Sequence, residues 1–399
     1  MRSLSLNALC SIRAEMNWQH NEIPHKEIYF SRNVNPRGDF LPAETKQELL
    51  ENAAGKKHIF YLHPGQGELP EYDPNRLKRF KKTQFDGRMP DNATLTPRYG
   101  RFYPKGRLLG PFNAFDTVPF RVLDVDASTF VADLNHPMAE KPVELALEVV
   151  DVTDNIDSMR PADWFKEMID GPGIQSRANN RPTEFITEDA LSRKDESPDS
   201  AFYNQPRLVI HLDTTAVNTV SEIYGRLVPH GADIIDLMSS WKSHLPKDRS
   251  YKRITGLGLN QEELAKNDRL TDYVVHDLNE HPVLPFEHRR YDAVICTVSV
   301  EYITHPFKVF QQVARILRPG GVFAVTFSNR WFPPKVITIW REIHEFERMG
   351  LVAEYFLNSG AYEHIGTISV RGLKRPSDDK YADAFEFSDP VYCVYGYAS

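Results

Sequence analysis

Residues 215–327 show the pattern that most constrains the fold of this chain, because short apolar runs alternate there with amphipathic helical segments. Apolar runs of this length suit strands that are buried on both faces of a sheet. Helices are expected at 215–227, QEELAKN and FKVFQQVARIL, and strands at 234–237, RITGLGL, YDAVICTV and GVFAVTF. This alternation predicts an α/β fold with a parallel, doubly wound sheet.

The segment IIDLMSSWKSHLP, residues 234–246, is expected to be the first such strand and the turn after it. A buried strand that ends in an acid, here Asp236, usually brings a ligand to its carboxyl end. The following turn is normally rich in glycine, which permits unusual backbone angles and close approach of the ligand. Here the turn contains Met238, Ser239, Ser240 and Trp241. The serines can still donate hydrogen bonds, whereas Trp241 must point away from the ligand or stack on it.

Composition excludes several classes of function. The chain has 48 basic and 55 acidic residues, a formal net charge of -7, so it lacks the basic excess that would favour nucleic acid as a partner. Cys10, Cys296 and Cys393 lie far apart and predict neither a disulfide framework nor a metal site. Cys296 lies within an apolar strand and is interpreted as packing. No apolar run approaches the roughly 18 residues of a membrane span, and we expect a cytoplasmic protein without a membrane partner.

The length of 399 residues predicts two domains. Residues 154–200 are polar and rich in turn formers, and we interpret them as a linker between residues 1–153, with an ordered core from residue 25, and residues 201–399. Before this linker, the segments PFRVLDVD, TFVADLN and VELALEVVDV alternate apolar and polar positions with a period of two. That period predicts an antiparallel, half-exposed sheet.

Residues 202–399 contain four landmarks in order: the strand and turn at 234–246, Asp277-Leu278-Asn279 followed by LPF, YDAVICTVSVEYITHP, and RILRPGGVFAVTFSNR. In this order they resemble a class I S-adenosylmethionine-dependent methyltransferase. The resemblance implies a Rossmann-like fold, S-adenosylmethionine as cofactor, and methyl transfer to an unidentified small-molecule or peptidic acceptor. It also implies a set of cofactor-binding residues: Asp236, Met238, Ser239, Ser240, Trp241, Gly258, Asn260, Asp277, Leu278, Thr297 and Ser299. Asp277 and Leu278 would contact adenine, and residues 238–241 would surround the methionine moiety.

Two departures from the family pattern bear on this site. The Gly-x-Gly-x-Gly turn is absent, and ITGLGLNQEEL places Gly258 where most members carry an acid for the ribose hydroxyls. Asn260 or Glu262 is the nearest replacement, and an amide makes weaker hydrogen bonds than a carboxylate. The opposing interpretation is a degenerate fold that binds no cofactor. The strings SSWxSHLP, GLGLNxEEL and SNR together resemble a distinct subgroup of methyltransferase-like proteins.

Tyr203, Arg207 and His211 recur at four-residue spacing, so a helix would present them on one face. Arg207 could hold a carboxylate or phosphate of the substrate, and His211 could accept a proton; the alternative is a capping helix with a structural histidine. A general base is needed only for a protonated or weakly nucleophilic acceptor. The candidate bases are His211, His244 and Glu301, and the candidate substrate ligands are Tyr203, Arg207, Asn329 and Arg330.

Residues 119–152, which include the string NHPMAE, are similar to the closing half of an FKBP-type, SlyD-like peptidyl-prolyl isomerase, and TPRYGRFYP resembles its tyrosine-glycine segment. The resemblance implies a β-rich α+β domain with an aromatic groove lined by Tyr99, Phe102, Phe112, Phe120 and His136. The alternatives are that these residues form an ordinary core, or that the domain docks a client or mediates homodimerisation. The corresponding second function is an isomerase, chaperone-type or client-binding protein with a non-catalytic methyltransferase fold.

Overall fold

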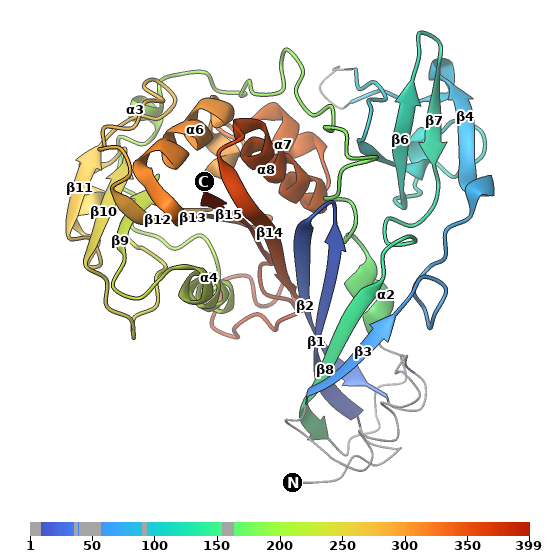
Figure 1. Ribbon diagram of the computed structural model, residues 1–399, viewed down its shortest axis with the longest axis horizontal. Helices are drawn as coiled ribbons and strands as arrows, with labels where there is room; N and C mark the ends of the chain where they lie inside the picture. The colour runs from blue at the N-terminus through green and yellow to red at the C-terminus, as the bar shows by residue number, and fades with distance from the viewer. Residues whose placement is uncertain (1–8, 36–38, 40–56, 90–93, 154–162) are drawn as a thin grey trace. The chain divides into compact units, whose positions relative to one another are not determined.

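The computed structural model describes residues 9–35, 39, 57–89, 94–153 and 163–399, in two compact units (Figure 1). Unit 1 comprises residues 1–21, 31–187 and 343–351, and unit 2 comprises residues 22–30, 188–342 and 352–399. These units differ from the predicted limits of 1–153, 154–200 and 201–399. Residues 22–30 belong to unit 2 because they pair with a strand of its sheet, and pairing between segments so distant in sequence leaves no local signal.

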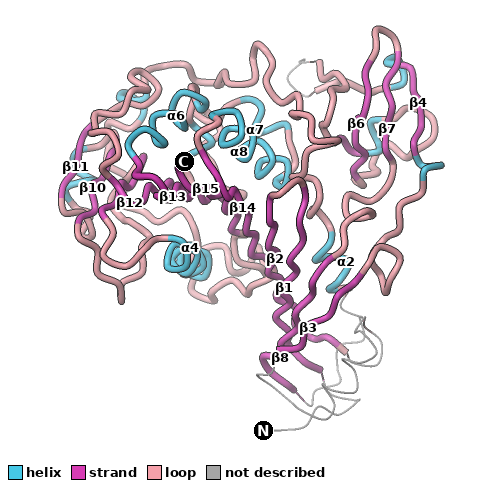
Figure 2. The backbone as a smooth tube through the Cα atoms, in the orientation of Figure 1, coloured by secondary structure: helices cyan, strands magenta, loops and turns pink. Residues whose placement is uncertain are grey.

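Unit 2 is built on a mixed sheet in the order β11-β10-β9-β12-β13-β15-β14, to which residues 25–29 of β2 add a parallel strand beside β14 (Figure 2). The strands β9 to β13 are parallel, and β15 is antiparallel to both of its neighbours. The first five follow the doubly wound order 3-2-1-4-5, which confirms the predicted Rossmann-like sheet. The bounds of all the strands named for this sheet are β2 Ile23–Val34, β9 Asp233–Leu237, β10 Arg253–Gly258, β11 Asp272–Val275, β12 Tyr291–Thr297, β13 Leu317–Phe327, β14 Tyr362–Arg371 and β15 Val391–Ala398.

Helices cover both faces of this sheet. Helix α4, Thr214–Leu227, buries its apolar face in a cluster that includes Val322 and Ala324 of β13. Helix α6, Pro306–Ile316, packs on the opposite face, because the ring of Phe310 lies 5.0 Å from that of Phe323, and successive strand residues face opposite sides. The remaining helices that include unit 2 residues are α3 Asp199–Phe202, α5 Gln261–Ala265, η4 Val300–Tyr302, α7 Thr338–Glu342 and α8 Glu345–Ser359.

The predicted helical face of Tyr203, Arg207 and His211 is wrong. Helix α3 ends at Phe202, and residues 203–212, here called the strap, contain no helix. Pro206 explains the difference, because it has no backbone N–H and disfavours helical angles at Gln205 before it.

Unit 1 contains two sets of antiparallel strands, in the orders β4-β7-β6-β5 and β1-β8-β3. The predicted hairpin of β6 and β7 is present, and Asp126 Oδ1 accepts the backbone N–H groups of Ser128 and Thr129 in its turn. The third predicted strand, β8, pairs with β1 and β3 instead of extending this sheet. The bounds are β1 Leu9–His20, β3 Lys57–Leu62, β4 Leu77–Lys81, β5 Phe102–Pro104, β6 Pro119–Val125, β7 Thr129–Asp133 and β8 Val143–Thr153, with short helices η1 Pro74–Arg76, η2 Lys82–Gln84, η3 Lys105–Arg107 and α2 Trp164–Ile169.

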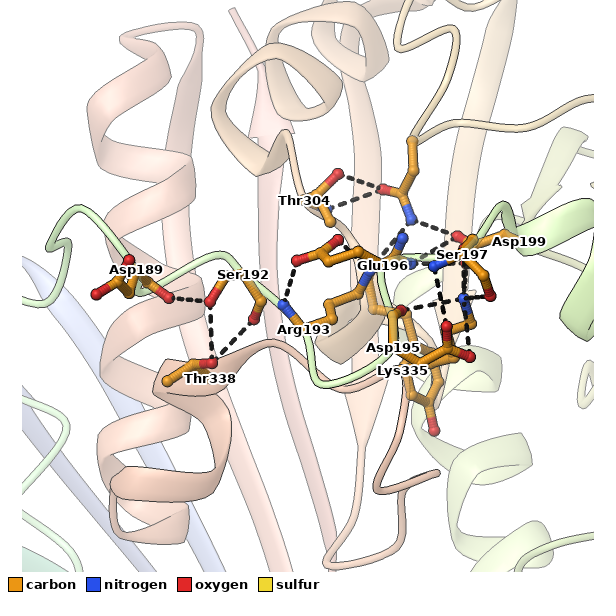
Figure 3. A network of polar contacts seen from close by, with 12 residues as sticks. Asp189, Ser192, Arg193, Asp195, Glu196, Ser197, Asp199, Thr304, Lys335 and Thr338 are labelled. Carbon is orange, nitrogen blue, oxygen red and sulfur yellow. Dashed lines mark hydrogen bonds and ion pairs between the residues drawn. The ribbon is translucent and has the colours of Figure 1, made fainter. Parts of the chain in front are cut away.

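The predicted linker, in its described part, is not a solvated connector; its residues 154–162 lie outside the described residues. In unit 1, α2 fully buries Trp164, Phe165 and Met168. In unit 2, Asp199 Oδ1 lies 2.7 Å from Nη1 of Arg193 and 3.2 Å from Nζ of Lys335 (Figure 3). Within RKDESPDS, Arg193 and Asp199 are paired inside the unit, whereas Lys194 and Glu196 face water, so local composition did not distinguish the segment from a linker.

The aromatic side chains proposed for an isomerase groove lie mostly in the interior of unit 1. Phe120 is completely buried in a cluster with Tyr103 and Phe130, and Phe112 packs against that cluster. Tyr99 and Phe102 are also buried, and Tyr99 Oη donates to the carbonyl of Ala178. Nδ1 of the half-buried His136 accepts from the N–H of Met138. These contacts correspond to the alternative interpretation of an ordinary aromatic core.

No helix in the described parts of the chain is both long enough and apolar enough to cross a membrane.

Candidate functional site

A cavity of about 170 Å³ opens at the carboxyl ends of β9, β10 and β12 in unit 2. This volume is more than ten times the ~10–15 Å³ that one water requires, so the cavity is large enough for a ligand. Most of the sequence-predicted site residues line it: Tyr203, Arg207, His211, Asp236, Met238, Ser239, Ser240, Trp241, His244, Gly258, Asn260, Asp277, Leu278, Thr297 and Ser299.

Three predicted site residues do not line this cavity. Glu301 lies in η4 and is 1 % exposed, so the structure does not support its role as a base. Arg330 Nε pairs with Asp389 Oδ1 at 3.0 Å, and its guanidinium lies over the ring of Tyr381. Asn329 is exposed outside the cavity. The prediction of Asn329 and Arg330 as substrate ligands is corrected accordingly, because the chain after β13 directs Phe332, not these two residues, to the cavity wall.

The turn after β9 keeps the backbone conformation of a glycine turn without the glycine. Met238 has φ of 56°, in the left-handed region that side chains normally disfavour. The N–H of Ser239 donates to the carbonyl of Leu257 at 2.7 Å, which fixes the turn against β10. The sequence departure at Met238 therefore changes the side chain and leaves the path of the backbone intact.

Met238→Gly is expected to be more stable than Met238→Ala by about 1 kcal/mol, because both variants remove the side chain and only alanine retains the penalty of the left-handed region. Chemical unfolding of the two variants measures the difference directly. Ser240, whose φ is not positive, provides the matched control, and there alanine should equal or exceed glycine in stability. Equal stability of the two Met238 variants would show that the turn relaxes out of this conformation.

Asp236 is the buried acid of the site. Its carboxylate is 4 % exposed and accepts hydrogen bonds from the hydroxyls of Ser239 and Ser243. Burial raises the pKa of Asp236 from 3.8 to about 6, although the two serine hydroxyls oppose the shift. A cation bound in the cavity would favour the ionised form, so Asp236 is suited to a positively charged ligand.

The pKa of Asp236 predicts how stability changes with pH. Because this pKa is higher in the folded state than in the unfolded state, its stabilising effect is complete below about pH 4 and is lost as the pH rises through about 6. The whole change corresponds to about 3 kcal/mol. Asp236→Asn should lack it, so its unfolding free energy relative to the parent should improve between pH 4 and pH 7.5 in denaturant titrations. A difference that does not vary with pH would contradict this pKa.

Gly258 and Asn260, expected near the ribose, have structural roles in this fold. A Cβ on Gly258 would lie 2.1 Å from the carbonyl oxygen of Ser239, so the strand end has no room for the acid found in the family. Asn260 caps α5, since its Oδ1 accepts from the N–H groups of Glu262 and Glu263. Its Nδ2 donates to the carbonyls of Tyr203 and Asn204. The amide of Asn260 is therefore engaged at both ends, and we no longer assign it to the ribose.

The strap is held across the cavity by residues that the sequence marked as departures from the family pattern. Trp241 Nε1 donates to the carbonyl of Val209 at 3.0 Å. Glu263, which sequence reasoning missed, accepts from the N–H of Arg207 with Oε1 and from Ser240 Oγ with Oε2, both at 2.6 Å. The unusual turn thus supports an added wall of the cavity.

Two histidines in the cavity are neutral at neutral pH. Burial lowers the pKa of His244 to about 4. The pKa of His211 is also lowered, by burial first and then by the charges of Arg207 and Lys380. The ring of His211 lies 5.0 Å from that of Phe332. Both neutral imidazoles have a free electron pair for a proton, but a pKa of about 4 makes His244 a weak base at neutral pH. Phe332, two residues after the SNR string, is a cavity residue that sequence reasoning missed.

Asp277 and Leu278 line the cavity after β11. Asp277 Oδ1 accepts from the N–H groups of Asn279 and Glu280, at 2.9 and 3.2 Å, which fixes the carboxylate. No hydrogen bond to its Oδ2 is found among the described residues, so this oxygen is free to accept from a ligand. Leu278 is 4 % exposed and presents an apolar side chain to the cavity.

Residues 241–325 match the family model described as a methyltransferase domain. No curated protein matches the chain. Similar solved structures include an S-adenosylmethionine-dependent methyltransferase of Thermotoga maritima, described as a possible histamine N-methyltransferase, at 13 % identity and a TM-score of 0.34, covering 46 % of this chain and 90 % of that one. Another, from Mesorhizobium loti, has 15 % identity and a TM-score of 0.31, covering 45 % and 99 %. The family match implies S-adenosylmethionine as the cofactor.

The residues present fit this cofactor at both of its ends. The available Oδ2 of Asp277 and the apolar Leu278 suit an adenine ring with its amino group, and the buried Asp236 suits a cationic ammonium or sulfonium. The ribose lacks the usual strand-end acid, because Gly258 occupies that position.

Proposed function

We propose that this protein is an S-adenosylmethionine-dependent methyltransferase that acts on a small-molecule or peptidic acceptor in the unit 2 cavity. The observation that carries this proposal is the overlap of two findings. The methyltransferase-domain match begins at Trp241, in the turn after β9, and ends at Val325 in β13. The loops after β10 and β12, which lie within that range, line the cavity together with the turn after β9, in which the match begins.

The proposed roles follow from position in the cavity. Asp277 and Leu278 bind adenine, and residues 238–241 with Asp236 surround the methionine moiety. When bound, the cofactor supplies an electrophilic methyl group on a sulfonium. The chain contributes mainly by holding the acceptor in line with that methyl group, which accounts for most of the acceleration in such transfers.

A neutral His211 or His244 takes the proton of an acceptor that must lose one. His211 lies on the strap and His244 follows the turn after β9, and both line the cavity. A soft, unprotonated acceptor would need neither residue.

The test is calorimetric titration with S-adenosylmethionine and S-adenosylhomocysteine. Asp277→Ala should weaken the binding of both ligands by tenfold or more, about 1.4 kcal/mol, because the adenine amino group loses its hydrogen-bond acceptor. Asp248→Ala, at an exposed position after the same turn, is the matched control and should bind as the parent does. Absence of binding by the folded parent protein would overturn the proposed function.

The finer assignment of unit 1 as an FKBP-like isomerase domain is not proposed, because no observation favours it. The residues expected to form its groove are largely interior, Phe120 completely so.

A further inference from the structure

Arg207 has a distinctive environment on the strap. Its guanidinium carbon lies 4.4 Å from the ring centroid of Phe202, 5.4 Å from that of Tyr203 and 4.9 Å from that of Phe332. Its Nη2 donates to the carbonyl of Phe202 at 3.3 Å, and Glu263 accepts from its backbone N–H. The aromatic faces stabilise the cation and hold the planar group in one orientation at the cavity wall.

The side chain of Arg207 has no acidic ion-pair partner in the part of the chain that the structure describes, although the Glu263 carboxylate accepts from its backbone N–H. Its Nη1 is buried without a hydrogen-bond acceptor among the described residues. Lys242, the other lysine or arginine that lines the cavity, pairs with Asp268 at 3.0 Å. An unpaired buried donor on a charged group is costly, so an acceptor supplied by a ligand would be favoured at this group.

In the described part of the chain, four acidic side chains line the cavity, and two of them are engaged within the protein: Asp199 pairs with Arg193 and Lys335, and Glu263 accepts from Ser240 Oγ and from the backbone N–H of Arg207. Asp236 and Asp277 lie on the wall formed by the strand ends, where the cationic parts and the adenine of the cofactor would bind. Arg207 lies on the strap, where its charge contributes to the lowered pKa of His211. An anion is therefore favoured beside the strap, next to a neutral imidazole and the ring of Phe332.

We propose that Arg207 binds a carboxylate, and that this carboxylate belongs to the methyl acceptor; the second part rests on the proposed function. A carboxylate matches the single unpaired cation, because a doubly charged phosphate would be only half neutralised there. Guanidinium groups also bind carboxylates in a defined plane, which would orient an acceptor toward the cofactor. The methionine moiety of the cofactor is the other possible source of a carboxylate, and the experiment separates the two.

The experiment uses calorimetry with three probes: benzoate, S-adenosylhomocysteine, and 5′-methylthioadenosine, which retains the nucleoside and sulfur but lacks the amino-acid carboxylate. Benzoate is titrated into the protein alone and into the protein saturated with S-adenosylhomocysteine. Arg207→Met is the main variant, and Arg207→Lys retains the charge if the methionine variant does not fold. Arg181→Met is the matched control, because the guanidinium carbon of Arg181 also lies over an aromatic ring, 3.8 Å from the ring centroid of Tyr99 in unit 1.

We expect Arg207→Met to weaken the binding of benzoate at least tenfold and to leave the affinity for both nucleosides unchanged. Arg181→Met should bind all three probes as the parent does. This result assigns the carboxylate to the acceptor. If Arg207→Met loses tenfold in affinity for S-adenosylhomocysteine but not for 5′-methylthioadenosine, Arg207 does bind a carboxylate, and that carboxylate belongs to the cofactor. Parent-like binding of benzoate and both nucleosides by the variant overturns the proposal. If the parent binds neither nucleoside, the proposed function fails, and benzoate binding to the protein alone still decides the role of Arg207.

Discussion

Gly258→Ala is expected to destabilise unit 2 by about 3 kcal/mol and to weaken the binding of S-adenosylhomocysteine at least tenfold. The new Cβ would lie 2.1 Å from the carbonyl oxygen of Ser239, a backbone atom that can move only if the turn after β9 moves. That turn also carries the N–H of Ser239, which donates to Leu257, so the shift would break this contact. Chemical unfolding and calorimetric titration of the same preparation measure both effects.

Gly225→Ala in α4 is the matched control. The closest atom to its new Cβ is a side-chain carbon of Pro246 at 3.1 Å, and alanine suits a helix, so stability should stay within about 1 kcal/mol of the parent. If Gly258→Ala folds and binds like the parent, the close approach of the turn to β10 is not a requirement of the site.

Lys335→Met is expected to destabilise the protein by about 3–5 kcal/mol, the usual result of removing one member of a buried ionic network. The ammonium of Lys335 is completely buried, lies 3.2 Å from Asp199 Oδ1, and donates to the carbonyl of Ser197 at 2.6 Å. Methionine preserves much of the volume but leaves Asp199 with less positive charge around it. The midpoint of chemical denaturation measures the loss.

Lys308→Met, on the exposed side of α6, is the control for loss of a lysine and should change stability by less than about 0.5 kcal/mol. Asp199 also lines the cavity and accepts from Asn279, next to the proposed adenine site. Lys335→Met should therefore also weaken S-adenosylhomocysteine in conditions where the variant remains folded. A variant as stable as the parent would show that the network in Figure 3 does not hold residues 193–199 in place.

Much of unit 2 could be predicted from local pattern. Buried parallel strands and amphipathic helices leave periodic signals that do not depend on distant residues, so 215–227 and the strands β9, β10, β12 and β13 were located correctly, whereas β11 was not predicted. Because the strands of such a sheet bring their carboxyl ends to one edge, residues as distant as Asp236 and Thr297 could be assigned to one site.

Other features depend on contacts that no local pattern reports. The strap follows Pro206, yet its place over the cavity is set by Trp241, Asn260 and Glu263. The charges of residues 193–199 resemble a solvated linker until Lys335, distant in sequence, is placed among them.

The sequence by itself determined the doubly wound sheet of unit 2, the resemblance of residues 202–399 to a methyltransferase family and the edge of the sheet at which the cavity lies. Only the tertiary structure decided that Met238 keeps a left-handed turn, that Asn260 and Trp241 anchor the strap, and that Arg207 has no acidic partner among the described residues. The physical reason is that periodicity records which face of an element is buried, whereas hydrogen bonds and ion pairs between distant segments depend on where the completed fold places them.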